Sequence, residues 1–111
     1  MDCIFCKIIK KKEPADIVYE DKKVIVFKSK FPKADLHILI IPKRHIQSIN
    51  YLKEKDKDLV GQLFMVAQKI AKEKKVAKKG YKLIFNVGKE GGQLINHLHL
   101  HLLYGKRIYF P

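Results

Sequence analysis

Apolar residues recur at three- and four-residue steps between residues 56 and 76, with lysines at many of the positions between them. This spacing predicts an amphipathic helix that packs one face on a core and exposes the other. Gly80 follows the stretch and its terminal lysines, as expected where a helix ends. The apolar face consists of Leu59, Leu63, Val66, Ala67 and Ile70.

Short apolar stretches bounded by turn residues predict five strands, over residues 17–20, 23–28, 36–41, 81–87 and 94–104. Asp21 and Lys22 suit a tight turn, Pro42 ends the third strand, and Gly105 ends the fifth. A short amphipathic helix with a basic outer face is expected over residues 5–12, ending near Pro14. Strands, one long helix and two more strands predict an α+β fold with a mainly antiparallel sheet.

Length and composition predict one domain over residues 1–111 that needs no disulfide to hold its core. Hydrophobic residues make up 47% of the chain and charged residues 32%, as in soluble globular proteins. No apolar run approaches the roughly 20 residues that span a bilayer. The apolar stretch at residues 3–6 is too short for a signal peptide. We therefore expect a cytoplasmic protein without a membrane partner.

The chain carries a formal net charge of +13, but Arg44 and Arg107 are the only arginines among its 24 basic residues. Proteins that read base edges or clamp phosphates favour the planar arginine fork. Scattered lysines therefore indicate a solvated surface, and nucleic acid is the less favoured partner. A net positive field still attracts phosphates.

Three histidines alternate with leucines near the carboxyl end of the chain. On a strand, His97, His99 and His101 share one face, with neighbours about 7 Å apart, because side chains alternate. Leu98, Leu100 and Leu102 then face the core. Hydrogen-bonded core histidines and a zinc site made by all three are alternatives. Phosphoryl chemistry is favoured because neutral imidazole is a good nucleophile near pH 7.

Gly91 and Gly92 precede this strand and leave backbone N–H groups open to a phosphate, although Gly-Gly also marks ordinary turns. Near the other end, Cys3 and Cys6 have the spacing of half a metal site or of a redox pair. Without a secretory signal, a structural disulfide is disfavoured.

Together, these segments resemble the histidine-triad family, in particular its nucleotide-binding branch of purine nucleoside phosphoramidases. The signature is the alternation of histidines and hydrophobic residues over 97–103. The opening segment 3–9, the strand 37–45, the segments 86–88 and 91–93, and the tail 107–111 also match, in order and over nearly the whole chain.

The resemblance implies a five-stranded antiparallel sheet and a homodimer that joins two such sheets into one of ten strands. It implies hydrolysis of the P–N bond of purine nucleoside 5′-phosphoramidates, with no cofactor required for the chemistry. His99 would attack phosphorus and form a nucleotidyl-histidine, while His101 and His37 contact the phosphate and assist the leaving group. His97 completes the triad.

The resemblance also implies where the nucleotide lies. Asn86 would support the phosphate, and backbone N–H groups after Gln93 would hold one of its oxygens. An apolar wall suits the base, and its residues would be Ile4, Phe5, Ile8, Phe27 and Leu39.

Three positions depart from the family pattern. Ser29 stands where many relatives carry an aspartate beside the ribose, and serine has fewer acceptors for its hydroxyls. Leu94 stands where close relatives carry serine, so a hydroxyl near the leaving group is missing. The tail ends in Phe110-Pro111 where relatives often have tryptophan.

Cys3, Cys6, His45 and His97 form a candidate structural zinc site, as in several bacterial members of the family. The alternative is two free thiols on a short helix. Two further functions stay open: hydrolysis or nucleotidyl transfer on dinucleoside polyphosphates or nucleic-acid ends, and nucleotide binding without catalysis.

Overall fold

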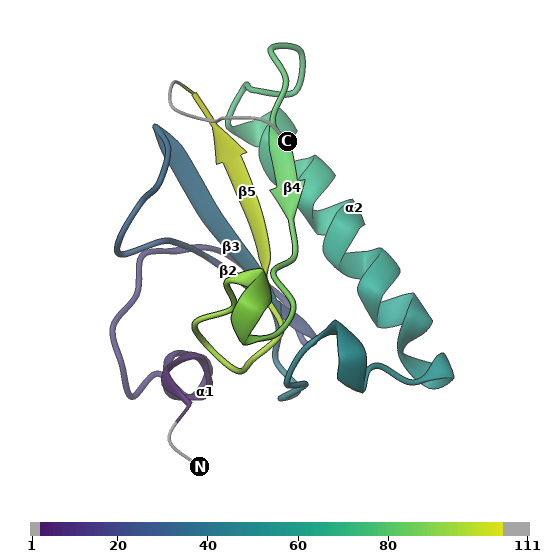
Figure 1. The fold of residues 1–111 in the computed structure, drawn as a ribbon. Coiled ribbons are helices and arrows are strands. Elements are labelled where there is room, and N and C mark those ends of the chain that lie inside the picture. Colours follow the sequence, from purple (N-terminus) through teal and green to yellow (C-terminus); the bar gives the residue numbers. More distant parts are fainter. Residues whose placement is uncertain (1–2, 106–111) are drawn as a thin grey trace.

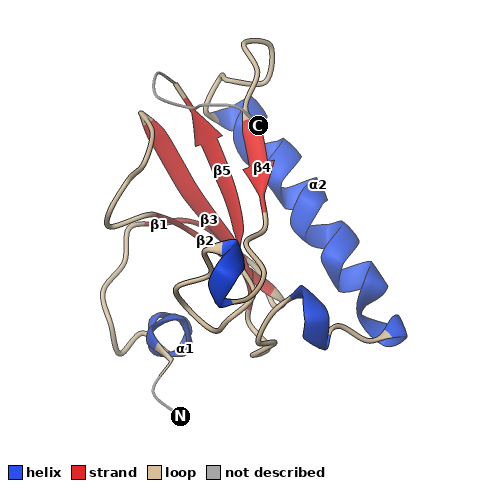
Figure 2. Cartoon of the chain, in the orientation of Figure 1, coloured by secondary structure: helices blue, strands red, loops and turns tan. Residues whose placement is uncertain are grey.

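The computed structural model describes residues 3–105, which form one antiparallel sheet and two α-helices (Figures 1 and 2). In chain order, the elements are α1 (Ile4–Ile9), β1 (Ile17–Glu20), β2 (Val24–Lys28), β3 (Leu36–Pro42), α2 (Lys57–Glu73), β4 (Lys82–Ile84) and β5 (Leu100–Tyr104). The strand order across the sheet is β1-β2-β3-β5-β4, and each neighbouring pair is antiparallel. The predicted α+β architecture is confirmed.

Alternation along the central strands divides the core between the two faces of the sheet. Val24 and Val26 of β2 pack with α2, whose buried residues are the predicted Leu63, Val66, Ala67 and Ile70 together with Ala71. Ile25 and Phe27 of the same strand face the other way and pack with α1. The short helix therefore covers the face opposite the long helix, and the candidate site lies on that side.

Both helices end earlier than predicted. The helix predicted over 5–12 ends at Ile9, since Lys11 adopts a left-handed φ of 63° that an α-helix cannot continue through. The long helix ends at Glu73, and Lys75, with φ 63°, takes the left-handed position expected of glycine. Gly80 lies beyond a further turn and is not the residue that ends the helix.

The last two strands are shorter than predicted. The strand expected over 81–87 is restricted to Lys82–Ile84, and the one expected over 94–104 begins only at Leu100. His97 and His99 thus precede β5 in irregular backbone. The alternation nevertheless persists, because Leu98 belongs to the core on the α2 side, whereas the rings of His97 and His99 both pack against Phe5 on the α1 side.

No helix within residues 3–105 is long and apolar enough to cross a membrane. The predicted tail match at 107–111 lies outside the described residues.

Candidate active site and metal cluster

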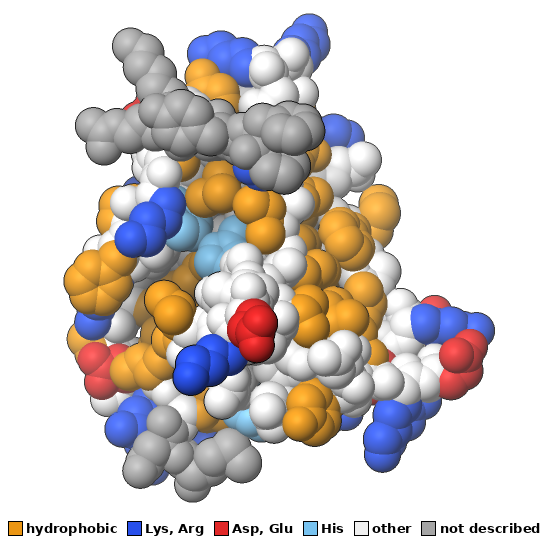
Figure 3. Space-filling view, in the orientation of Figure 1, with side chains coloured by type: hydrophobic (Ala, Val, Ile, Leu, Met, Phe, Trp, Pro, Cys, Tyr) orange, Lys and Arg blue, Asp and Glu red, His pale blue; other side chains and the backbone are white. Residues whose placement is uncertain are grey.

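A cavity of about 990 Å³ opens on the α1 side of the sheet. It is lined by α1, the end of β2, the loop between β2 and β3, and the segment leading into β5. In Figure 3, histidine side chains are visible in a recess bordered mostly by hydrophobic side chains. His37, His99 and His101 all line this cavity, whereas His97 does not.

His99 is held in one tautomer by the backbone. Its Nδ1 lies 2.7 Å from the carbonyl oxygen of His97, and because that oxygen can only accept, Nδ1 carries the proton. The neutral ring therefore has its lone pair on Nε2. Burial lowers the pKa of His99, against the opposing effect of this hydrogen bond. A neutral imidazole with a fixed lone pair is suited to nucleophilic attack.

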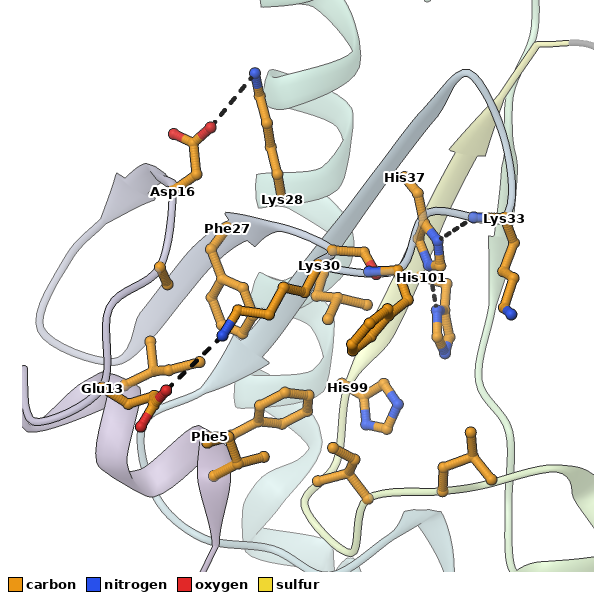
Figure 4. Close-up of a pocket in the computed structure, with 18 of the residues that line it drawn as sticks. Phe5, Glu13, Asp16, Phe27, Lys28, Lys30, Lys33, His37, His99 and His101 are labelled. Atoms are coloured by element: carbon orange, nitrogen blue, oxygen red, sulfur yellow. Dashed lines mark hydrogen bonds and ion pairs between the residues drawn. The ribbon is translucent and has the colours of Figure 1, made fainter.

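His37 and His101 form a directed chain of hydrogen bonds (Figure 4). The backbone N–H of Lys33 donates to Nδ1 of His37 at 3.0 Å, so the proton of the neutral His37 ring is on Nε2. That nitrogen lies 2.9 Å from Nδ1 of His101, which must accept. His101 therefore keeps its own proton on Nε2, where it is available to donate.

Burial keeps this pair neutral at pH 7. Burial, with the neighbouring His99 and His37, lowers the pKa of His101 to about 4. Burial and then the positive charge of Lys33 lower the pKa of His37. The ring of His101 lies 4.8 Å from that of His99, centroid to centroid, so donor and nucleophile face one cavity.

The apolar wall predicted for the base lies at one end of the same cavity. Phe5 packs edge-on against Phe27 at 5.5 Å and against His99 at 5.2 Å between ring centroids. The other predicted wall residues, Ile4, Ile8 and Leu39, also line the cavity. The wall thus abuts the ring of His99 directly.

Of the remaining predicted residues, three line the cavity, and one stabilises a loop beside it. Ser29, Asn86 and Leu94 line the cavity. The Ser29 hydroxyl accepts from the backbone N–H of Phe31 at 3.3 Å, and Asn86 donates to the carbonyl of Gly91 at 2.8 Å. Leu94 is 91% exposed at the rim.

Gln93 is buried and does not line the cavity. Its side chain accepts from the N–H of Gly88 at 2.9 Å and donates to the carbonyls of Gln47 and Ile95 at 2.8 and 3.0 Å. All its polar atoms are therefore used inside the protein, and the side chain fixes the loop that leads to the histidines.

Charged residues at the rim were absent from the predicted site. Lys28 pairs with Asp16 at 3.6 Å, and Lys30 pairs with Glu13 at 3.8 Å. Lys33 also lines the cavity. These pairs join segments separated in sequence, so no local pattern could have revealed them.

A cluster of possible metal ligands lies next to His99, on the side of the His97 backbone. Cys3, Cys6, His45 and His97 each offer a ligand atom, and the four atoms lie within 4.8 Å of one another. Nδ1 of His97 lies 3.4 Å from Sγ of Cys3, 3.6 Å from Sγ of Cys6 and 3.1 Å from Nδ1 of His45. Cys6 Sγ lies 3.4 Å from His45 Nδ1.

The ring of His97 is oriented for this cluster. Its Nε2 lies 2.8 Å from the carbonyl oxygen of Pro42, so that nitrogen carries the proton and Nδ1 presents a lone pair. Ligands in protein metal sites are commonly oriented in this way through their second nitrogen. The four residues are close enough to bind a metal ion.

Comparison with known proteins agrees with this geometry. Residues 2–107 match the family described as "Scavenger mRNA decapping enzyme C-term binding". An uncharacterised HIT-like protein from Buchnera aphidicola subsp. Acyrthosiphon pisum is 50% identical over 95% of this chain and 92% of its own length.

Solved structures extend the match. The structure titled as a HIT family hydrolase from Legionella pneumophila shares 42% identity and a TM-score of 0.95, covering 99% of this chain and 98% of the other. A histidine triad nucleotide-binding protein from Candida albicans shares 30% identity and a TM-score of 0.86, covering 99% and 83%. The chain belongs to the histidine-triad (HIT) family.

Proposed function

We propose that the protein is a nucleotide hydrolase that cleaves the P–N bond of purine nucleoside 5′-phosphoramidates through a nucleotidyl-His99 intermediate. The observation that carries the proposal is the 2.7 Å contact from His99 Nδ1 to the His97 carbonyl, which leaves Nε2 unprotonated. The names of the Legionella and Candida relatives, a hydrolase and a nucleotide-binding protein, support the same class of activity.

In this mechanism, the lone pair on Nε2 of His99 attacks phosphorus, and the P–N bond breaks as the leaving nitrogen takes a proton from the His101–His37 pair. Water then attacks phosphorus, His99 leaves with its lone pair restored, and a proton from that water returns to the pair. The chain of hydrogen bonds from Lys33 through His37 orients the donor before substrate arrives.

The apolar wall explains how a nucleoside would be held. The base lies against Phe5 and Phe27, at the end of the cavity nearest α1, and the phosphate lies at the imidazoles. The ribose then lies between them, near Ser29, whose backbone N–H is bonded to the carbonyl of His37 at 2.9 Å. A serine there can serve fewer ribose hydroxyls than a carboxylate.

The proposal includes a structural zinc ion at Cys3, Cys6, His45 and His97. In a tetrahedron with Zn–N of about 2.0 Å and Zn–S of about 2.3 Å, nitrogens lie roughly 3.3 Å apart and sulfur–nitrogen pairs about 3.5 Å. Four of the six separations between the ligand atoms, from 3.1 to 3.6 Å, are close to this set, and all six are within 4.8 Å. Such an ion would anchor α1, and with it Phe5 and the base wall, beside His97.

The protein is further proposed to act as a homodimer. In the described sheet, β4 lies at an edge, and half-exposed Phe64 of α2 packs edge-on against Phe85 at 5.8 Å beside it. Met65 is 61% exposed. Light scattering should give a molar mass twice that of one chain. Met65→Glu should lower this mass toward that of the monomer, whereas Lys72→Glu should leave it unchanged. A monomeric wild type would refute the dimer.

Steady-state turnover of a fluorogenic adenosine phosphoramidate tests the activity. His99→Ala should lose about 10³-fold or more in kcat. It should still bind adenosine monophosphate, because the base wall is intact. Lys72→Ala, on the exposed side of α2, is the control that keeps wild-type turnover. Full activity in His99→Ala would overturn the assignment.

A further inference from the structure

Five charged side chains line the cavity, and four of them neutralise one another. Asp16 and Glu13 pair with Lys28 and Lys30, and both pairs lie on the side of Phe27 and Phe5 (Figure 4). Lys33 is the fifth, and within residues 3–105 no ion pair involves its ammonium group. The cavity therefore has balanced charge at the base end and a net cation beside the histidines.

The position of Lys33 is fixed by its own backbone. Its N–H donates to His37 Nδ1 at 3.0 Å, and His37 in turn contacts His101. After burial, the positive charge of Lys33 also lowers the pKa of His37. The four-carbon stem is flexible, so the ammonium can reach a group held at His101.

The leaving group must lie at this end of the cavity. Displacement at phosphorus proceeds in line, so the leaving nitrogen lies opposite His99 Nε2. It must also meet its proton donor, His101. In the proposed function, the base lies at the opposite end of the cavity, against Phe5 and Phe27, whose rings pack edge-on.

Lys33 is the charged lining residue near this end, and the amide of Asn86, which also lines the cavity, donates to the carbonyl of Gly91 at 2.8 Å. Leu94 on the rim offers no polar atom, and it is almost fully exposed. Asp35, the nearest carboxylate along the chain, borders a separate hollow with Tyr104 and Gly105. An anionic leaving group would therefore meet a cation here without a competing carboxylate from the cavity lining.

We propose that this site selects phosphoramidates whose leaving amine carries negative charge, a carboxylate or a phosphate, and that Lys33 is the residue that recognises it. The inference rests on the proposed function and narrows its substrate class. Lys33 determines specificity here and takes no part in breaking the bond. A leaving amine with a second positive charge, such as a diamine or lysine, is disfavoured by the same field.

A matched set of substrates isolates the charge. Adenosine 5′-phosphoramidates of glycine, glycinamide and ethylenediamine have leaving groups of similar size that are anionic, neutral and cationic. The measured quantity is the ratio of kcat/KM for glycine to that for glycinamide, compared between wild type and variants. Intrinsic differences in amine reactivity cancel in that comparison.

In Lys33→Met, the glycine-to-glycinamide ratio should fall about twofold to fivefold. In Lys33→Glu, the preference should move toward ethylenediamine. Lys28→Met removes the same charge at the base end and should leave the ratio unchanged. The phosphoramidate of O-phosphoethanolamine, compared with that of glycine, identifies phosphate or carboxylate as the preferred anion.

An unchanged ratio in Lys33→Met, or an equal fall in Lys28→Met, would overturn the inference. A uniform loss on all three substrates would also overturn it, by placing Lys33 on the transferred phosphate. If the wild type turns over all three substrates without discriminating between their charges, this inference is refuted and the proposed function is not. No wild-type turnover of any of these substrates would refute the proposed function and this inference with it.

Discussion

His99 Nδ1 lies 2.7 Å from the backbone carbonyl oxygen of His97, and this contact joins the candidate nucleophile to the candidate metal-binding cluster. The ring of His97 belongs to the cluster, where Nδ1 faces Cys3, Cys6 and His45. One residue thus contributes its side chain to one site and its backbone to the other. Loosening the cluster should disturb the orientation of His99.

The proposed zinc ion at Cys3, Cys6, His45 and His97 can be measured directly. Purified wild type should contain about one zinc ion per chain by elemental analysis, and Cys6→Ser should retain little of it. Loss of a structural ion should lower the Tm by at least about 5 °C. Activity should also fall, because α1 carries Phe5 onto His99.

His101→Asn is the matched control for that experiment, since it alters the histidine cavity without touching a ligand. It should keep its zinc while losing turnover. Wild type that contains no zinc after purification, and takes none up from zinc chloride, would refute the structural ion.

Substitution of Gln93 tests whether its side chain stabilises the loop that leads to the histidines. Gln93→Met keeps the approximate volume but leaves the Gly88 N–H and the Gln47 and Ile95 carbonyls without their partner. We expect a loss of about 1–3 kcal/mol in the free energy of unfolding, measured by urea titration. Gln47→Met should cost less than about 0.5 kcal/mol because the Gln47 side chain is exposed. Equal effects of the two substitutions would contradict this role.

His101 should make stability depend on pH. Its pKa is lowered from 6.5 to about 4 in the folded protein, so the unfolded chain binds more protons between these values. The stabilisation is complete above about pH 6.5 and is lost progressively as pH falls toward 4. Urea titrations at pH 7 and pH 5 should show a smaller difference in His101→Asn than in wild type. A variant with an equal or greater difference would contradict the lowered pKa.

Periodicity predicted the two faces of the sheet correctly because burial follows alternation even where the backbone is irregular. His97 and His99 precede β5, yet Leu98 still points into the α2 side of the core. Element ends were harder to predict. Lys75 takes a left-handed conformation for which its side chain gives no signal, while Gly80 suggested a helix end further along.

Long-range partnerships are the part that sequence patterns could not supply. The motif around Gln93 predicts backbone N–H groups at the phosphate, whereas the burial of its side chain against the Gln47 carbonyl depends on tertiary packing. The pairing of Glu13 with Lys30 likewise joins two loops. The tautomers of His37, His99 and His101 follow from backbone contacts that exist only in the folded chain.

The proposed reaction passes through a covalent bond between Nε2 of His99 and phosphorus. Wild type should be mixed rapidly with an adenosine phosphoramidate, quenched in neutral denaturant, and examined by intact mass and peptide fragmentation. We expect a transient adduct of one adenylyl group on His99, absent from His99→Ala. Turnover with no adduct at any time, or an adduct on another histidine, would contradict it.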